Sequence, residues 1–139
     1  MALPVNINDL VNGRSVEWER LEFKKGWNPE DVLHSICAFA NDIHNWGGGY
    51  IIIGIEEQKG VPVLPPIGVD IYQLDTIQKE IVNLNHKIEP YTTVITEPVE
   101  YKEKMILIIW IPGGDTRPYK APVKLGKDEH ISGKRYYIR

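Results

Sequence analysis

The sequence contains a single cysteine, Cys37, and no apolar stretch long enough to cross a bilayer. One thiol excludes an internal disulfide and any zinc site built from several cysteines. The longest apolar runs, residues 50–53 and 105–110, are far shorter than the roughly 20 residues of a membrane-spanning helix. The N-terminus also lacks the basic and apolar regions of a secretory signal peptide. We therefore expect a cytoplasmic protein without a membrane partner.

Motifs of several enzyme classes are also missing. The glycine triplet at residues 47–49 is not followed by the lysine and Ser/Thr of a phosphate-binding loop, and a helix rather than a strand is predicted before it. This argues against a P-loop ATPase. The four histidines lack the spacing of a zinc-binding motif, so we expect surface or capping roles for them. Cys37 falls on the apolar face of a predicted helix, which indicates a buried structural residue rather than a nucleophile.

The 139 residues are 42% hydrophobic and 25% charged, which is typical of one folded domain. Alternation over residues 17–24 predicts a strand. Asn28 and Pro29 are suitable first residues of a helix, as N-cap and first helical position. Its apolar stripe continues to Ile43, and the glycine triplet at residues 47–49 is expected to end it.

The remaining pattern predicts a mixed sheet with a second long helix. Residues 50–55 form a β-branched apolar run typical of a strand buried on both faces. The further expected elements are a helix at 75–87 and strands at 92–100, 105–111 and 135–139. Together these predict an α/β (α+β) domain, with a mixed β-sheet packed with two main helices, over residues 16–139 after a lead-in at 1–15. The last strand has no turn signal after it, so we expect the chain to continue in a longer protein.

The charge is unevenly distributed along the chain. The net charge is −3, but residues 1–116 carry −8 and residues 117–139 carry +5. Lysine and arginine neutralise phosphates, and the tyrosines of the tail can stack on unpaired bases. An ordinary edge strand protected by lysine and proline explains the tail equally well. The candidate phosphate contacts are Arg117, Lys120, Lys134, Arg135 and Arg139, and Lys24 and Lys25 are expected to add to the same surface.

An acidic cluster is the second candidate site. Glu17 and Glu22 flank the first predicted strand, and Glu56 directly follows the strand at residues 50–55. If these strands pair, three carboxylates converge at one sheet edge and offer the oxygen ligands that Mg²⁺ or Mn²⁺ prefers. Lys24 on the same face could then stabilise charge developing on a phosphate. The alternative is that these charges simply form the solvent face of a strand.

Five short motifs in order resemble the Schlafen-type Alba-like domain, which is widespread in bacterial proteins labelled as transcriptional regulators or DNA-binding proteins. They are Leu21-Glu22-Phe23-Lys24, Ala38-Phe39-Ala40-Asn41, residues 47–55, Ile88-Glu89-Pro90 and residues 135–139. The resemblance implies a compact α/β domain that handles nucleic acid. It also implies an N-terminal module placed before a winged-helix or other C-terminal region.

Schlafen proteins with ribonuclease activity use three acidic residues of this domain as a metal-dependent site. By motif, Glu22 matches one of them, Glu17 a second, and Glu56 stands where the third is an aspartate. Glu57 is the alternative counterpart of the third residue. The extra methylene displaces that carboxylate, and residues 42–46 lengthen a loop beyond the family form. Schlafens also build their groove from two such domains, so a single copy implies a homodimer or another segment.

Three hypotheses follow for the function. The first is a binding module, the DNA- or RNA-binding domain of a bacterial transcriptional regulator, which needs no cofactor. The second is an enzyme, a Mn²⁺- or Mg²⁺-dependent endoribonuclease that uses Glu17, Glu22 and Glu56. The third is an assembly domain that leaves recognition of nucleic acid to a partner.

Overall fold

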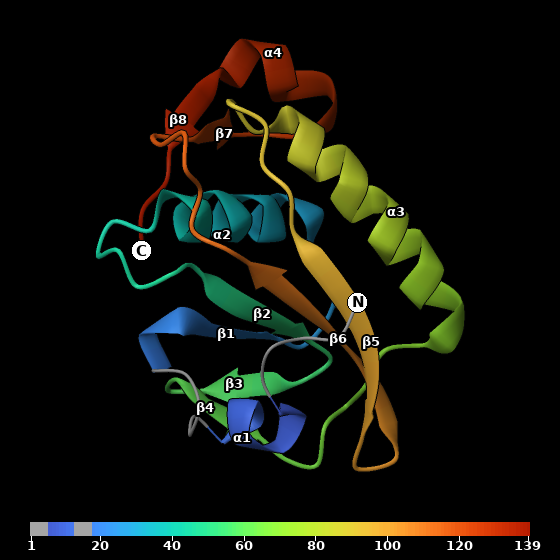
Figure 1. The fold of residues 1–139 in the computed structure, drawn as a ribbon. Helices are drawn as coiled ribbons and strands as arrows, with labels where there is room; N and C mark the ends of the chain where they lie inside the picture. The colour runs from blue at the N-terminus through green and yellow to red at the C-terminus, as the bar shows by residue number, and fades with distance from the viewer. Residues whose placement is uncertain (1–5, 13–17) are drawn as a thin grey trace. The chain divides into compact units, whose positions relative to one another are not determined.

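The computed structural model describes residues 6–12 and 18–139, and its mixed α/β content confirms the expected α/β (α+β) fold class (Figure 1). Its contacts divide the chain into two units, which we describe separately. Unit 1 comprises Met1–Trp27, Tyr50–Gln78 and Ile95–Trp110, and unit 2 comprises Asn28–Gly49, Lys79–Val94 and Ile111–Arg139. Among the described residues, no helix combines the length and the apolar character needed to span a bilayer.

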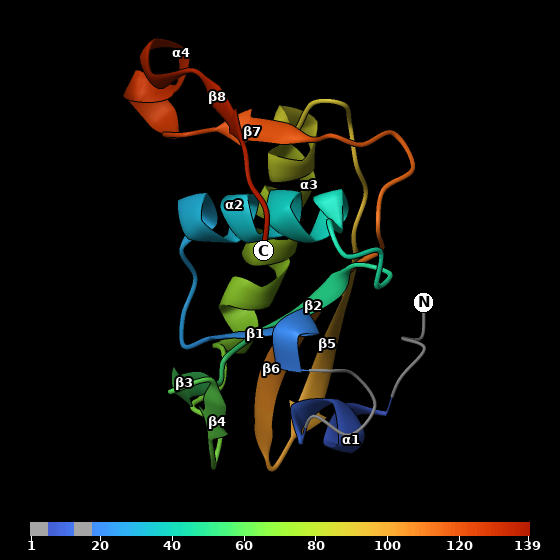
Figure 2. The same cartoon turned by 90° about the vertical axis from the view of Figure 1, so that its left-hand side faces the viewer.

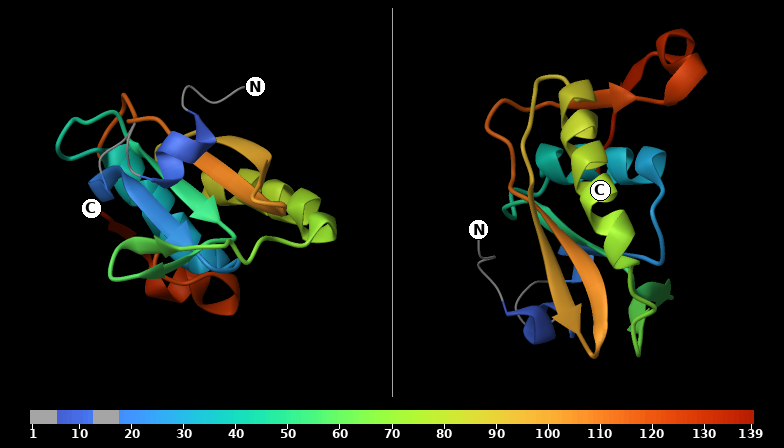
Figure 3. Two further views of the ribbon diagram at one scale, coloured as in Figure 1. Left: turned by 90° about the horizontal axis from the view of Figure 1, so that it is seen from below. Right: turned by 90° about the vertical axis from the view of Figure 1, so that its right-hand side faces the viewer.

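A four-stranded sheet forms the centre of unit 1. Its strands lie in the order β1 (Leu21–Lys24), β2 (Gly49–Ile53), β6 (Lys104–Ile111) and β5 (Ile95–Tyr101) (Figure 3). β1 and β2 are parallel, whereas β5 and β6 form an antiparallel hairpin. The sheet is therefore mixed, as the sequence predicts.

The core of unit 1 is built from the alternating buried side chains of β1 and from a short helix in the expected lead-in. Leu21 and Phe23 are buried, while the residues between and after them are half-buried, as period-2 alternation requires. The short helix α1 (Ile7–Val11) contacts β5 and buries Leu10 and Val11 completely in the same cluster. Part of the stretch expected as a lead-in thus belongs to the hydrophobic core.

A small hairpin follows β2. Gly54, with a φ of 111°, redirects the chain after β2, a conformation that favours glycine. The next strands are β3 (Glu56–Gln58) and β4 (Val61–Val63), which pair antiparallel. Glu56 therefore opens a new strand, with Gly54 and Ile55 between it and β2.

In unit 2, α2 (Pro29–Asn41) begins where the sequence predicts. The side chain of Asn28 accepts a hydrogen bond from the backbone N–H of Asp31 at 3.2 Å, which satisfies a donor that the helix leaves unpaired. The predicted end was wrong, because Asp42 adopts a left-handed conformation with a φ of 42°. The chain leaves the helix there, and Ile43 is exposed instead of continuing the apolar stripe.

The rest of unit 2 is built from the end of α3 (Ile71–Lys87), which starts in unit 1, and from the C-terminal segment. β7 (Lys120–Pro122) and β8 (Lys134–Tyr136) form an antiparallel ribbon, and α4 (Glu129–Ser132) lies between them in sequence. β7 contacts α2, and the ribbon lies along that helix (Figure 2).

Two of the predicted strands differ from their expected bounds for identifiable reasons, one local and one that involves a distant residue. The strand expected at residues 17–24 begins at Leu21, because residues 18–20 form a 3₁₀ turn. The strand expected at residues 135–139 covers Lys134–Tyr136. After it, the Tyr137 carbonyl accepts a hydrogen bond from a side chain of α2 rather than from a strand.

Candidate nucleic-acid interface

The side chain of Asn41, at the end of α2, holds the C-terminal segment in place. Its Nδ2 donates to the carbonyl oxygens of Tyr119 at 2.9 Å and of Tyr137 at 2.7 Å. Its Oδ1 accepts from the backbone N–H of Tyr119 at 2.6 Å. A single buried carboxamide thus bonds the backbone of the residue before β7 and of the residue after β8.

Neighbouring side chains of α2 reinforce this attachment. The His34 ring stacks on Tyr137 with centroids 4.1 Å apart, and its Nε2 lies 2.8 Å from the Pro122 carbonyl oxygen. The Cys37 thiol donates to the Tyr119 carbonyl at 3.3 Å. Burial raises the pKa of Cys37 to about 11, although a backbone hydrogen bond at Tyr137 opposes the rise. The thiol is therefore protonated and buried, which confirms the expected structural role.

Arg117 binds the end of α2 in this structure. Its guanidinium donates to the carbonyl oxygens of Asn41 at 3.3 Å and of Asp42 at 2.9 Å, and to Asn45 Oδ1 at 3.3 Å. Burial alone would raise the pKa of Asp42. Backbone N–H groups of the following loop, Trp46 among them, together with Arg117 lower it below its usual range. Arg117, predicted as a phosphate contact, thus also stabilises the loop that ends α2.

Lys120 on β7 and Lys134 on β8 share one carboxylate. Lys134 forms an ion pair with Glu89, and the Lys120 Nζ lies 3.8 Å from the other oxygen of the same side chain. The backbones of Glu89 and Lys120 also pair, with N–H···O hydrogen bonds of 2.9 and 2.8 Å in the two directions. The side-chain hydrogen bond and the charge of Lys134 lower the pKa of Glu89. The structure thus brings two of the predicted cations together around an acidic residue that the charge pattern did not single out.

The other predicted cations of unit 2 have different surroundings. Arg135 is exposed on β8 and faces Ala121 in the ribbon register. The Arg139 guanidinium lies 4.8 Å from the centre of the Phe39 ring, within cation–π range. Unit 2 as a whole contains nine Lys/Arg and eight Asp/Glu. The positive charge is therefore a local feature of residues 117–139 rather than a property of the whole unit.

The second group of predicted residues lies in unit 1. On β1, the Lys24 Nζ lies 3.2 Å from Glu22 Oε2, and both side chains are largely buried, at 20% and 14% exposure. Lys25 follows the strand and is exposed. β1 contacts β3, whose first residue is Glu56. Glu17 lies outside the described residues, so the predicted trio stays a prediction. Within 6–12 and 18–139, no group of three His, Cys, Asp or Glu side chains is placed to hold a metal ion.

Sequence reasoning missed the residues that position the tail. Asn41 entered only as part of a short motif, although it makes the three bonds that fix Tyr119 and Tyr137. Glu89 entered in the same way, although it pairs two predicted cations. Asn41 and Tyr119 are 78 residues apart, so local spacing carries no signal for such a pair. The signal available in the sequence was the motif Ala38-Phe39-Ala40-Asn41 itself, because a buried asparagine at a helix end needs hydrogen-bond partners.

Residues 17–139 match the model of the family described as Schlafen, AlbA_2. The structure is similar to the solution structure of the N-terminal domain of a RecG-related protein from Nitrosomonas europaea. The TM-score is 0.60 at 22% identity, over 94% of this chain and 86% of that one. A second match, to the DIP2311 protein from Corynebacterium diphtheriae, has a TM-score of 0.45 at 19% identity and covers 84% of this chain and 22% of that one. No curated protein matches the chain.

We expect Asn41→Ala to destabilise the protein by roughly 2–3 kcal/mol, because it leaves buried backbone groups of Tyr119 without their partner. Urea unfolding followed by circular dichroism measures the change. Asn83→Ala, at an exposed position of α3, is the matched control and should change the stability by less than about 0.5 kcal/mol. Equal stabilities of the two variants would contradict the role assigned to Asn41.

Proposed function

The chain belongs to the Schlafen, AlbA_2 family, and we propose that it is the nucleic-acid-binding domain of a bacterial transcriptional regulator. The observation that carries the proposal is the β7–β8 ribbon, which gathers Lys120, Lys134 and Arg135 on a two-stranded element of unit 2. The name of the structurally similar RecG-related protein also points to nucleic-acid transactions.

The ribbon suits phosphate binding for two reasons. Its backbone is fixed by the bonds of Asn41 and the stack of His34 on Tyr137, so little ordering is needed on binding. Its basic side chains are accessible to solvent: Arg135 is exposed, and the side chain of Lys134 is 30% exposed. Such cations contact the phosphate backbone without reading sequence, so the ribbon supplies affinity rather than specificity.

We assign phosphate contacts to Lys120, Lys134 and Arg135. Arg117 and Arg139 are further contacts, and each must keep or exchange its present partner, the loop after α2 for Arg117 and the Phe39 ring for Arg139. Lys24 and Lys25 are candidate contacts on unit 1. We further propose that the domain works in the cytoplasm as part of a longer protein, joined to a C-terminal module. We also propose that it forms a homodimer, so that two domains build one groove.

The proposal is tested by anisotropy titrations of fluorescent duplex and single-stranded oligonucleotides at rising salt. We expect binding that weakens with salt, and Arg135→Ala should weaken it and reduce the magnitude of the salt slope by about 1, since one phosphate contact is lost. Lys102→Ala, in the β5–β6 turn of unit 1, is the control of equal charge change and should leave the slope unchanged. Absence of binding at low salt would overturn the proposal in favour of an assembly domain.

Glu89→Gln should strengthen binding several-fold at low salt. The carboxylate of Glu89 now neutralises both Lys134 and Lys120, and the amide would leave these cations to phosphate while changing the side-chain shape little. Glu129→Gln is the control, because it changes the net charge equally but releases Lys87, its partner at 2.7 Å. An equal gain in both variants would show that total charge, not the local pairing, sets the affinity.

A metal-dependent endoribonuclease is the second candidate function, favoured by the partly buried Glu22–Lys24 pair and by the contact of β1 with β3. Glu22 and Glu56 offer the oxygen donors that suit Mg²⁺ or Mn²⁺, and Glu17 would complete the set. A bound divalent ion supplies an activated water and charge for a phosphoryl group. Lys24, now paired with Glu22, would neutralise a phosphate oxygen.

Glu22→Gln distinguishes this candidate from simple binding. If the domain is a nuclease, purified protein cleaves structured RNA with Mn²⁺ but not in EDTA, and the variant loses at least about a hundredfold in rate because a ligand charge is removed. Binding in EDTA should stay within a few-fold of the unaltered protein. Glu100→Gln, at an exposed position of β5, is the control. Cleavage that survives Glu22→Gln would eliminate the nuclease hypothesis.

A further inference from the structure

The β7–β8 ribbon of unit 2 carries an aromatic side chain that the fold does not use. Tyr136, the last residue of β8, is 62% exposed. In the part of the chain that the structure describes, its side chain has no hydrogen-bond partner and its ring stacks on no other ring. A tyrosine presents a large apolar face with little conformational freedom to lose, so an exposed ring on a fixed ribbon is available to a ligand.

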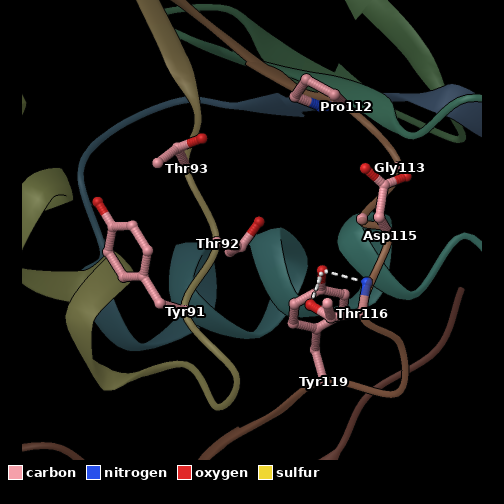
Figure 4. Close-up of a pocket in the computed structure, with 9 residues that line it drawn as sticks. Tyr91, Thr92, Thr93, Pro112, Gly113, Asp115, Thr116 and Tyr119 are labelled. Atoms are coloured by element: carbon pink, nitrogen blue, oxygen red, sulfur yellow. Dashed lines mark hydrogen bonds between the residues drawn. The ribbon is translucent and has the colours of Figure 1, made fainter.

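The other two tyrosines of the C-terminal segment are already engaged. Tyr119 is buried, and its hydroxyl accepts the backbone N–H of Thr116 at 3.2 Å and lies 2.9 Å from the Thr116 hydroxyl (Figure 4). The ring of Tyr137 stacks on His34. Of the three tyrosines in residues 117–139, Tyr136 is therefore the one whose ring a ligand can reach without displacing an internal partner.

The register of the ribbon places two lysines beside this ring. Tyr136 lies directly opposite Lys120, whose backbone groups bond Glu89 on the other side of β7. The two residues thus form a non-hydrogen-bonded pair, in which the side chains share one face and lie close together. Lys134 precedes Tyr136 by two residues on β8 and shares the same face. The carboxylate of Glu89, which contacts both lysines, shows independently that they point to one side.

An exposed ring between two ammonium groups suits a ligand that joins flat rings to anionic groups. Every nucleobase has a π-face that can stack on an aromatic side chain, and lysine binds phosphate oxygens as a point charge. The base faces inside a duplex are covered by the neighbouring base pairs, so they cannot reach the ring. The chemistry of this face therefore favours a single strand over a duplex.

We propose that Tyr136 stacks on one unpaired base of a single-stranded nucleic acid while Lys120 and Lys134 contact the phosphates that flank this base. The inference rests on the proposed nucleic-acid binding and adds a substrate class to it: single strands are bound in preference to duplexes. Discrimination among the bases is not expected, because stacking tolerates all of them.

The test uses short single strands in which one base is 2-aminopurine, whose fluorescence falls when it stacks. The unaltered protein should quench this fluorescence. Tyr136→Ala should abolish the quenching and weaken binding of single strands about tenfold. The salt slope should stay unchanged, because the substitution removes no charge. Tyr136→Phe should retain both the quenching and the affinity, because its ring still stacks.

Two further probes separate stacking from phosphate contact. A strand of abasic residues has the same phosphates without bases, and a duplex has bases whose faces are covered. Tyr136→Ala should change the affinity for either probe by less than about twofold, since the phosphate contacts remain. Tyr72→Ala, at an exposed tyrosine of α3 in unit 1, is the control for tyrosine removal and should change neither the quenching nor any affinity.

The negative outcomes are distinguishable. Salt-sensitive binding of single strands that Tyr136→Ala leaves unchanged would overturn the stacking assignment and leave the proposed function standing. An equal loss of affinity for single strands, abasic strands and duplexes would also overturn it, because the ring would then act on the ribbon rather than on a base. Absence of salt-sensitive binding to any probe would overturn the proposed function and, with it, this inference.

Discussion

The carboxamide of Asn41 makes the hydrogen bonds on which the rest of unit 2 depends. It satisfies the N–H and carbonyl of Tyr119 and the carbonyl of Tyr137 at once, and each of these groups would be costly to bury unpaired. The paired segment then carries Lys120 into the ribbon and keeps Tyr119 buried. A single polar side chain at a helix end thus determines where the cations of the ribbon lie.

Intramolecular carboxylates already occupy several of the cations that would contact nucleic acid. Glu89 pairs with Lys134 and Lys120 in unit 2, and Glu22 pairs with Lys24 in unit 1. A phosphate must compete with these partners, so each contact yields less free energy than an unpaired cation would. If the protein binds nucleic acid as proposed, these ion pairs would lower the affinity that each cation contributes while keeping the cations in position.

Elements with local signals were predictable from the sequence, and elements that depend on distant partners were not. Asn28 and Pro29 mark the start of α2 by chemistry within one turn. Its end at Asn41 depends on the left-handed conformation of Asp42, which its loop hydrogen bonds and Arg117, 75 residues away, support. The cation-rich tail was visible as charge. Its pairing with Glu89 was not, because Lys134 and Glu89 are 45 residues apart.

The open pocket of unit 2, lined by residues 91–93 and 112–116, had no sequence signature because its features come from common residues placed by the fold. Threonines, a tyrosine and two glycines predict nothing by their spacing, and Gly114 matters only since the chain passes so close to Tyr119. The same segment that lines the pocket continues directly into the basic ribbon. A ligand that contacted this segment and the ribbon together would therefore meet one preorganised support.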